Sequence, residues 1–462
     1  MRVTRTTENS LNTRRPDAEA TARGVEGQPW AEDHSDPGGQ KLIERMVGAE
    51  NMRSAWRQVK SNRGAPGVDG RDIDGTAALL RARWPEIKQS LLSETYRPQP
   101  VRRVEIPKPG GGVRKLGVPT VLDRLVQQAM HQVLSPLFEP TFSNHSYGFR
   151  PGRSAHQAVL RARGYQRDGK RWVADMDLKQ FFDEVNHDIL MSRIGRKVSD
   201  KRMKRLIASY LKSGVLSNGV AEATSKGTPQ GGPLSPLLSN ILLDDLDREL
   251  ERRGHAFCRY ADDCNIYVNS RRAGERVLAS VTRYVEDTLK LKVNTEKSVV
   301  GRPWERVFLG YSFTMHKATK LRVPQKSVKR FRAHVKTLCR QGRGRNLWRF
   351  INEELNPVLH GWIQYFRLAE VKGFAQDLDS WIRRRLRCIR WRQWKRRWTR
   401  FKKLVARGLD DETARRSAGN GRGPWWNAGA PHMNAAYQKR DFDRIGLVSL
   451  LDMLLNYRIA TS

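Results

Sequence analysis

Two adjacent carboxylates, Asp262 and Asp263, interrupt a stretch that otherwise favours β-strand. The flanking runs, His255–Cys258 and Asn265–Val268, are rich in aromatic and β-branched residues. The pattern predicts a β-hairpin with both aspartates at its turn. Asp is common in such turns because it tolerates unusual backbone angles and can hydrogen-bond its own backbone. The stretch alone therefore leaves two interpretations open, an ordinary acidic turn and a metal site.

A second candidate strand also ends in a carboxylate. Residues 171–178 (RWVADMDL) resemble a central strand, in which Asp177 follows apolar residues interrupted only by Asp175. Two strand ends that carry carboxylates can converge on a pair of divalent ions, roughly 3.5–4 Å apart, that promote phosphoryl transfer. Hard oxygen ligands favour Mg²⁺. Together, Asp177, Asp262 and Asp263 predict a magnesium site of this kind.

The charge of the chain indicates a polyanionic partner. Lys and Arg number 86 against 48 acidic residues, so the net charge is +38. An excess of this size is self-repulsive, and it favours nucleic acid as the partner over an anionic membrane surface. Residues 381–407 contain thirteen Lys or Arg and no acid, interleaved with Trp and Phe. This spacing suits RNA or DNA binding, although the tryptophans could also be core residues.

The remaining pattern predicts an α+β protein. Strands and helices alternate up to about residue 326, including a hairpin over 97–118 and strands near Leu291 and Phe308, and helices follow.

The first 40 residues lack periodicity and predict a disordered tail. No apolar run is long enough to span a bilayer, and the N-terminus lacks an apolar signal core. The four cysteines form no Cys-x-x-Cys pair, which favours a reducing cytoplasm without a structural zinc.

Three motifs occur one after another along the chain, and their order is specific. They are residues 177–183 (DLKQFFD), residues 229–236 (PQGGPLSP) before a predicted long helix, and residues 260–263 (YADD). In this order they resemble the intron-encoded reverse transcriptase/maturase of mobile group II introns, and are closest to subgroup C. Further blocks similar to that family lie at residues 97–129, 143–159, 289–298, 307–313 and 356–366.

The resemblance implies a right-hand polymerase with fingers, palm and a helical thumb. The expected order is fingers at 41–170, palm at 171–320 with part of the fingers interleaved, thumb or maturase (X) domain at 321–400, and a small basic nucleic-acid-binding domain at 401–462. The N-terminal extension of about 40 residues departs from the compact family pattern and receives no role.

The resemblance also implies roles for single residues. Asp177 matches the first catalytic aspartate, and Asp262 and Asp263 the second and third, with the third more peripheral. Two Mg²⁺ ions, for which Mn²⁺ can substitute, are expected on these carboxylates and on the backbone carbonyl of Leu178. Asp175 lies on the same strand face by its period of two, but the family spacing selects Asp177.

Further matches concern the nucleotide and the nucleic acid. Phe182 matches the residue under the incoming sugar, where a ring would exclude a ribose 2′-hydroxyl; a plain core phenylalanine is the alternative. The other residues expected at the nucleotide are Lys108 and Arg114 on the triphosphate, Gln230 and Gly231 against the nucleotide and template, and Lys297 near the pyrophosphate. The residues expected on nucleic acid in the thumb are Arg383, Arg384, Arg387, Lys395 and Arg396.

The implied function is RNA-directed DNA synthesis combined with binding of the intron RNA as a maturase, in support of splicing and of retrohoming by target-primed reverse transcription. The expected partners are intron RNA, a DNA primer and target, and deoxynucleoside triphosphates, with a monomer favoured and no membrane. The expected location is the bacterial cytoplasm, with nucleoid association during mobility. No His-Asn-His pattern or paired cysteines occur, so the resemblance implies a chain without the family's DNA endonuclease.

Two other functions fit the same blocks. One is a splicing cofactor with a decayed polymerase site, which predicts the loss of catalytic carboxylates. The other is a host-domesticated reverse transcriptase, which predicts altered motifs at the turn. The presence of Asp177, Asp262 and Asp263, together with Ala261 at the second position of the turn, favours the mobile-intron enzyme.

Overall fold

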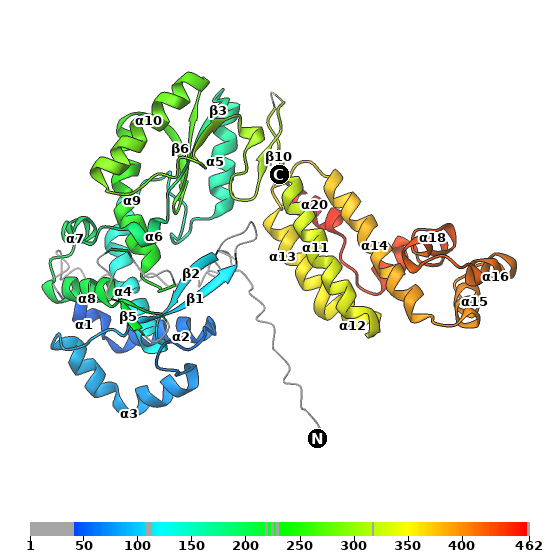
Figure 1. Cartoon of the computed structure of the whole chain (residues 1–462), viewed down its shortest axis with the longest axis horizontal. Coiled ribbons are helices and arrows are strands. Elements are labelled where there is room, and N and C mark those ends of the chain that lie inside the picture. Colours follow the sequence, from blue (N-terminus) through cyan, green and yellow to red (C-terminus); the bar gives the residue numbers. More distant parts are fainter. Residues whose placement is uncertain are drawn as a thin grey trace. The chain divides into compact units, whose positions relative to one another are not determined.

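The computed structural model describes residues 41–107, 113–217, 220–222, 226–227, 231–316 and 318–459. They form two compact units, the first ending at Gly301 and the second beginning at Arg302 (Figure 1). Residues 1–40, for which the sequence predicts a disordered tail, lie outside the described part of the chain. Among the described residues, no helix is both long and apolar enough to cross a membrane.

A four-stranded antiparallel sheet in the order β6–β7–β3–β8 forms the centre of the first unit. Its strands are β3 (Trp172–Asp177), β6 (Ala256–Tyr260), β7 (Asp263–Val268) and β8 (Val299–Gly301). The predicted hairpin is confirmed, because β6 and β7 pair directly on either side of Ala261 and Asp262. Of the two aspartates expected at its turn, only Asp262 lies there, and Asp263 is the first residue of β7, paired with Tyr260. β3 lies beside β7, so the end of β3 meets the start of β7 at one edge of the sheet.

Two helices pack on opposite faces of this sheet (Figure 1). α10 (Arg271–Thr288) lies on the face of Val300, which a side chain at Gly274 would touch. α5 (Ala155–Arg167) lies on the other face, where the thiol of Cys258 donates to its Ala158 carbonyl at 3.6 Å. Successive residues of a strand alternate between faces. Cys258 lies opposite Asn265, and Asn265 lies opposite Asp175, two residues before Asp177. Asp177 is therefore on the same face of the sheet as Cys258 and α5.

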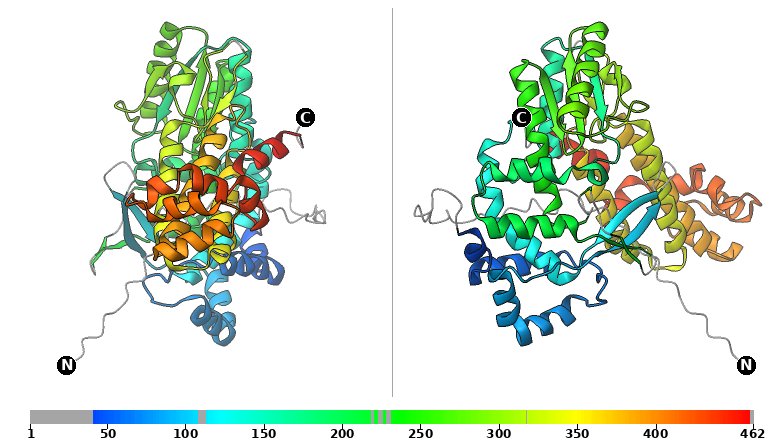
Figure 2. Two further views of the ribbon diagram at one scale, coloured as in Figure 1. Left: turned by 90° about the vertical axis from the view of Figure 1, so that its right-hand side faces the viewer. Right: turned by 60° about the vertical axis from the view of Figure 1, so that its left-hand side comes forward.

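A second, mixed sheet and several helices complete the first unit. The sheet has the order β2–β1–β4–β5, in which β1 pairs antiparallel to β2 and parallel to β4. Figure 2 shows β1 and β2 as a pair of cyan arrows, in agreement with the hairpin predicted over 97–118. The strands are β1 (Val101–Pro107), β2 (Val113–Val118), β4 (Val215–Ser217) and β5 (Val220–Glu222). The helices are α1 (Leu42–Met46), α2 (Ala49–Ser61), α3 (Ile73–Leu92), α4 (Val121–Phe138), α6 (Phe181–Glu184), α7 (His187–Gly195), α8 (Lys201–Lys212) and α9 (Ser235–Arg252).

One continuous apolar core joins the parts of the first unit. It includes Leu42 of α1, Met130 of α4, Met176 of β3, Leu242 of α9 and Val285 of α10, each almost completely buried. Burial of an aliphatic side chain of this size stabilises the fold by about 1.5–3 kcal/mol. Strands and helices that are far apart in the sequence are therefore held in one body, which can fix carboxylates from separate strands.

The second unit is almost entirely helical, as expected beyond residue 326. A short strand pair, β9 (Ser312–Phe313) and β10 (Leu321–Arg322), precedes the helices. The helices are α11 (Gln325–Gln341), α12 (Leu347–Arg349), a π-helical turn (Phe350–Leu355), α13 (Asn356–Tyr365), α14 (Gly373–Gln393), α15 (Arg397–Val405), α16 (Asp411–Gly419), α17 (Pro424–Asn427), α18 (Pro431–Ala436), α19 (Lys439–Arg444) and α20 (Leu450–Ile459).

One detail differs from the expectation. The strands predicted near Leu291 and Phe308 are wrong: Val293 and Phe308 each make only one isolated bridge. Leu291 and Phe308 are nevertheless almost fully buried, so their apolar character reflects packing rather than a strand. Residues 302–320 pack with the second compact unit, where the Tyr311 hydroxyl donates to the Tyr365 carbonyl.

Candidate active site

The strand register places two of the predicted catalytic aspartates opposite each other. Asp177 at the end of β3 pairs across the ladder with Asp263 at the start of β7. Directly opposite residues of an antiparallel pair have Cβ atoms about 4.5–5.5 Å apart, and like charges there are destabilising. Asp262 precedes Asp263 at the turn, and all three side chains are partly exposed. A cation between the carboxylates would relieve this repulsion.

The neighbours of Asp177 come from a loop more than a hundred residues later. The backbone N–H of Asp177 donates to the Ser298 hydroxyl at 3.0 Å, and the Asn294 N–H donates to the Asp177 carbonyl at 2.8 Å. The Asn294 amide also donates to Asp177 Oδ2 at 3.2 Å. Lys297 Nζ lies 3.5 Å from the same oxygen, so the predicted pyrophosphate lysine stands beside the first aspartate.

The donor set suits a hard divalent ion, because Asp177, Asp262 and Asp263 offer only carboxylate oxygens. Among the described residues, no three His, Cys, Asp or Glu side chains already converge as a closed metal site would require. The Asp177 side chain is 38% exposed and its Oδ2 contacts a lysine ammonium, so that a cation already lies at this carboxylate. The residue types fit Mg²⁺, and the position of an ion stays a prediction.

The turn between β6 and β7 is held from inside the unit by Arg259. Ala261 has φ of +58°, an uncommon conformation for a residue with a side chain. Its carbonyl accepts from Arg259 Nη1 at 2.9 Å, and Arg259 itself is 1% exposed. Arg259 forms a bidentate pair with buried Asp247, at 2.7 and 2.6 Å, and also donates to Asn240 Oδ1 at 3.1 Å. A buried charge pair therefore fixes the backbone that carries Asp262.

The same turn rests on the loop before α5. Asn240 Nδ2 donates to the Gly148 carbonyl at 2.8 Å, and the Tyr147 N–H donates to the Arg259 carbonyl at 2.9 Å. A Cβ added at Gly148 would lie 2.4 Å from the Ala261 nitrogen. Only glycine allows these two backbones to approach so closely.

We expect Gly148→Ala to slow DNA synthesis by roughly 100-fold, because misplacement of a catalytic group by about 1 Å has an effect of that size. The change pushes the added methyl group against backbone, which cannot rotate away as a side chain could. Steady-state primer extension measures the effect. Gly164→Ala is the matched control: a Cβ there meets nothing within 4 Å inside α5, so activity should be retained. Equal rates for both variants would contradict the turn's dependence on Gly148.

Phe182 and Gly231 both belong to the first unit, in different surroundings. Phe182 is partly buried, packs against the apolar core and meets Phe181 edge-on, with ring centroids 5.1 Å apart. Its ring is thus neither fully exposed nor a fully buried core residue. Gly231 has φ of +129°, and a Cβ there would lie 2.4 Å from the Gly117 carbonyl of β2. The turn after residue 230 therefore packs closely on the β1–β2 hairpin.

Electrostatics also link the hairpin to the segment after β3. Burial raises the pKa of Asp183, while Lys115 of β2 and Arg103 of β1 lower it in part. Two hairpin cations therefore lie near the residue that follows Phe182. Three predicted nucleotide contacts cannot be placed in this way. Lys108 and Gln230 lie outside the described residues, as does the side chain of Arg114.

Two family profiles match the chain in the order of its two units. The profile described as "Reverse transcriptase (RNA-dependent DNA polymerase)" matches residues 106–313, and "Group II intron, maturase-specific domain" matches residues 328–406. Protein YkfC of Escherichia coli (strain K12) is 34% identical over 346 residues, which cover 65% of this chain and 91% of YkfC. The chain belongs to the family of group II intron reverse transcriptase/maturases.

Other relatives match over smaller shares of their own length. Group II intron-encoded protein LtrA of Lactococcus lactis subsp. cremoris is 42% identical over 198 residues, 42% of this chain and 32% of LtrA. The "Putative COX1/OXI3 intron 2 protein" of Saccharomyces cerevisiae is 25% identical over 423 residues, 71% of this chain and 49% of the yeast protein. The chain thus spans a third to a half of these two relatives.

In the maturase part, the predicted nucleic-acid contacts have different surroundings. Lys395 and Arg396 are exposed, and Arg383 is half-buried. Arg384 lies over the Trp425 ring at 4.2 Å. Arg387 is 9% exposed and donates to the Tyr437 carbonyl at 2.9 Å. Burial, with Arg383 and Arg384 nearby, lowers the pKa of Arg387 to about 10. Arg384 and Arg387 therefore make contacts within the unit. Lys395 and Arg396, in contrast, are exposed to solvent.

The tryptophans of this basic segment also divide into two groups. Trp391 and Trp394 are buried at 1% and 5% exposure, so for these two the core alternative holds. Trp398 is 62% exposed, stacks on Phe401 with centroids 5.2 Å apart, and lies under Lys402 at 5.2 Å. An exposed ring beside cations is the combination that suits nucleic-acid bases and phosphates.

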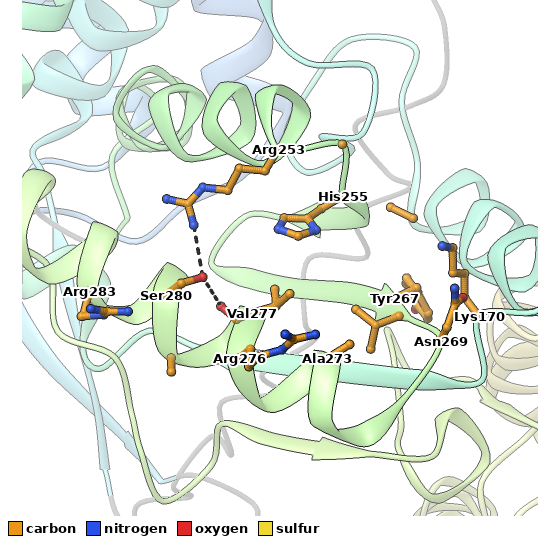
Figure 3. A pocket seen from close by; sticks show the side chains of 14 residues that line it. Lys170, Arg253, His255, Tyr267, Asn269, Ala273, Arg276, Val277, Ser280 and Arg283 are labelled. Carbon is orange, nitrogen blue, oxygen red and sulfur yellow. Dashed lines mark hydrogen bonds between the residues drawn. The ribbon is translucent and has the colours of Figure 1, made fainter.

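A basic cavity of 710 Å³ lies away from the turn between β6 and β7 (Figure 3). It opens where β6 begins and β7 ends, whereas the turn at Ala261 joins the opposite ends of these strands. None of the described residues that line it is acidic, and four are basic: Lys170, Arg253, Arg276 and Arg283. Burial lowers the pKa of His255 there, and Arg253 and Lys170 lower it further. The cavity is therefore a separate, positively charged surface.

Proposed function

We propose that this reverse transcriptase copies intron RNA into DNA at a two-Mg²⁺ site on Asp177, Asp262 and Asp263, and that its maturase domain binds the same RNA to support splicing and retrohoming. The observation that supports this most is the cross-strand pairing of Asp177 with Asp263 beside Asp262, on a turn fixed by buried contacts. The carbonyl of Leu178, the residue after Asp177, is the proposed fourth ligand.

When bound, the two divalent ions would activate a primer 3′-hydroxyl and stabilise the charge on the departing pyrophosphate. The residues of the chain supply position. The β3–β7 ladder holds the carboxylates at one edge, and Asn294 orients Asp177 by donating to its Oδ2. Phe182 would lie under the incoming deoxyribose, and Lys297, 3.5 Å from Asp177, would meet the pyrophosphate. Lys108 and Arg114 would grip the triphosphate, with Gln230 and Gly231 against the base pair.

The partners in this proposal are intron RNA, a DNA primer and deoxynucleoside triphosphates. We place the reaction in the bacterial cytoplasm, with the protein acting as a monomer at the nucleoid during mobility. Neither a His-Asn-His pattern nor paired cysteines occurs within the 462 residues. We therefore propose that the primer comes from another source and not from cleavage of the target by these residues.

Two assays on the purified full chain test the proposal. The first is extension of a DNA primer on an RNA template with deoxynucleotides and Mg²⁺; synthesis that disappears with a chelator and returns with Mg²⁺ is expected. The second is splicing of the cognate intron at near-physiological Mg²⁺, with and without protein. Splicing without DNA synthesis would identify a splicing-only maturase, and synthesis without any effect on splicing would identify a domesticated polymerase.

For the maturase domain, we expect the double variant Lys395→Ala/Arg396→Ala to bind intron RNA more weakly and with less dependence on salt. Both side chains are exposed, so the loss should come from phosphate contacts rather than from unfolding. Each lost contact lowers the slope of log affinity against log salt by about 0.7–0.9. A salt titration of RNA binding measures the slope.

The matched control for this variant is Arg416→Ala in α16. Arg416 is exposed and pairs with Glu412 one turn earlier at 3.3 Å, so it represents a cation of the same unit that is already neutralised. Its salt slope should equal that of the unchanged protein. An unchanged slope in the Lys395/Arg396 double variant would remove these residues from the RNA interface.

A further inference from the structure

Phe149 combines two unfavourable features at one exposed position. Its φ is +58°, a left-handed conformation that is an outlier for a bulky aromatic residue. It is 50% exposed, so burial of its ring offsets this strain only in part. Glycine or asparagine would adopt this backbone with less strain. Strain that persists in an exposed residue points to a role outside the fold.

The backbone on both sides of Phe149 is held firmly, which explains how the strain is maintained. Before it, the carbonyl of Gly148 accepts from Asn240 at 2.8 Å, inside the unit. After it, the guanidinium of Arg150 is 8% exposed and donates to the Ser146 carbonyl at 2.9 Å and to Glu139 at 2.8 Å. The loop is therefore rigid, and Phe149 is presented to solvent in a fixed position.

The ring lies beside the catalytic turn. Its centroid is 6.2 Å from that of Tyr260, with the ring planes tilted by 46°. Tyr260 is partly exposed and stands two residues before Asp262. Rings at this distance and tilt contact each other, so Phe149 and Tyr260 form one aromatic surface. A primer whose 3′-hydroxyl reaches Asp262 would carry its last base pairs past these two rings.

We propose that Phe149 and Tyr260 form an aromatic contact for the terminal base pairs of the primer–template duplex, an inference that rests on the proposed polymerase function. Aromatic rings interact with bases and sugars of any sequence, as a polymerase requires, and each such contact contributes substantially to affinity. The same loop also carries a cation: Arg153 lies over the Tyr147 ring at 5.7 Å and donates to Asn144 at 2.7 Å. Phe149 is a duplex-contact residue and takes no part in the chemical step.

The test uses Phe149→Ala and Phe149→Gly in the full chain, with a short RNA–DNA primer–template as the probe. The dissociation constant, measured without deoxynucleotides, should rise by about tenfold, the effect of one lost aromatic contact. The kcat at saturating primer–template should stay within about threefold of the unchanged protein, since the carboxylates remain in place. The Tm should be unchanged for alanine and unchanged or higher for glycine, because glycine relieves the strained backbone.

Leu160→Ala in α5 is the matched control, since Leu160 is another exposed apolar side chain of the same unit at 38% exposure. Its dissociation constant should not change. Binding by both Phe149 variants as tight as in the unchanged protein, while that protein extends primers, overturns the inference. A fall in Tm together with weaker binding in both variants also overturns it, because the residue would then be structural. Failure of the unchanged protein to extend any primer would instead overturn the proposed polymerase function.

Discussion

Replacement of Asp262 by alanine is expected to lower primer extension on an RNA template by on the order of 10³-fold or more. The change removes a carboxylate at the turn where β7 begins, beside the Asp177–Asp263 pair. Metal ions held by such carboxylates contribute several kcal/mol of charge stabilisation in the transition state, and each 1.36 kcal/mol corresponds to a tenfold change in rate. Single-turnover extension with saturating primer–template measures the loss directly.

Variants of the neighbouring aspartates make this test specific. Asp263→Ala should lower activity less than Asp262→Ala, since we expect Asp263 to take the more peripheral of the three aspartate positions. Asp175→Ala is the matched control, because Asp175 lies on β3 two residues before Asp177 and on the same face. It should retain most of the activity. All three proteins should still bind intron RNA. Undiminished synthesis by Asp262→Ala would refute the assignment of the site.

The parts of the fold that the sequence predicted are those encoded by local patterns. The two strands around the acidic turn, the strand that ends at Asp177 and the β1–β2 hairpin all follow from alternation and turn residues. The assignment of the chain to its family follows from several motifs that occur in a fixed order, because no single motif is specific enough. The basic helices beyond residue 326 follow from composition and periodicity.

The parts that could not be predicted depend on contacts between distant segments. Arg259 looks like one more surface cation, yet it is almost fully buried against Asp247. Arg387 likewise lies in a run of cations that predicts a nucleic-acid surface, and its charge serves a buried carbonyl. Leu291 has the apolar neighbours of a strand but packs in the core without one. In each case the side chain's environment is set by tertiary packing, which overrides the local signal.

Phe149 and Gly148 were missed for a related reason. The motif of residues 143–159 marked the segment, but only the structure gives the φ of Phe149 and the approach of Gly148 to Ala261. A glycine followed by an aromatic residue has no distinctive local meaning. A backbone outlier next to the proposed catalytic turn does, because strain tends to collect at functional sites.

The second large effect is expected at the buried Arg259–Asp247 pair. Arg259→Met leaves the Asp247 carboxylate, which is fully buried, without its partner. Loss of one member of such a pair lowers the free energy of unfolding by about 3–5 kcal/mol. Denaturant unfolding of the chain measures this change. Arg271→Met is the control: Arg271 pairs with Glu275 on the surface of α10, both more than half exposed, so the change should be within about 1 kcal/mol.

A double variant separates the stability of this pair from its role at the turn. Asp247→Leu/Arg259→Met removes both charges, and apolar replacement of a buried pair is often neutral or stabilising, so the unfolding free energy should recover most of the loss. The Ala261 carbonyl, however, still lacks the hydrogen bond that it accepts from Arg259 Nη1. Primer extension by the double variant should therefore remain at least about tenfold slower than that of the unchanged protein, while its binding of primer–template should be unchanged. Full activity in a refolded, stable double variant would show that the pair serves stability alone and does not position Asp262.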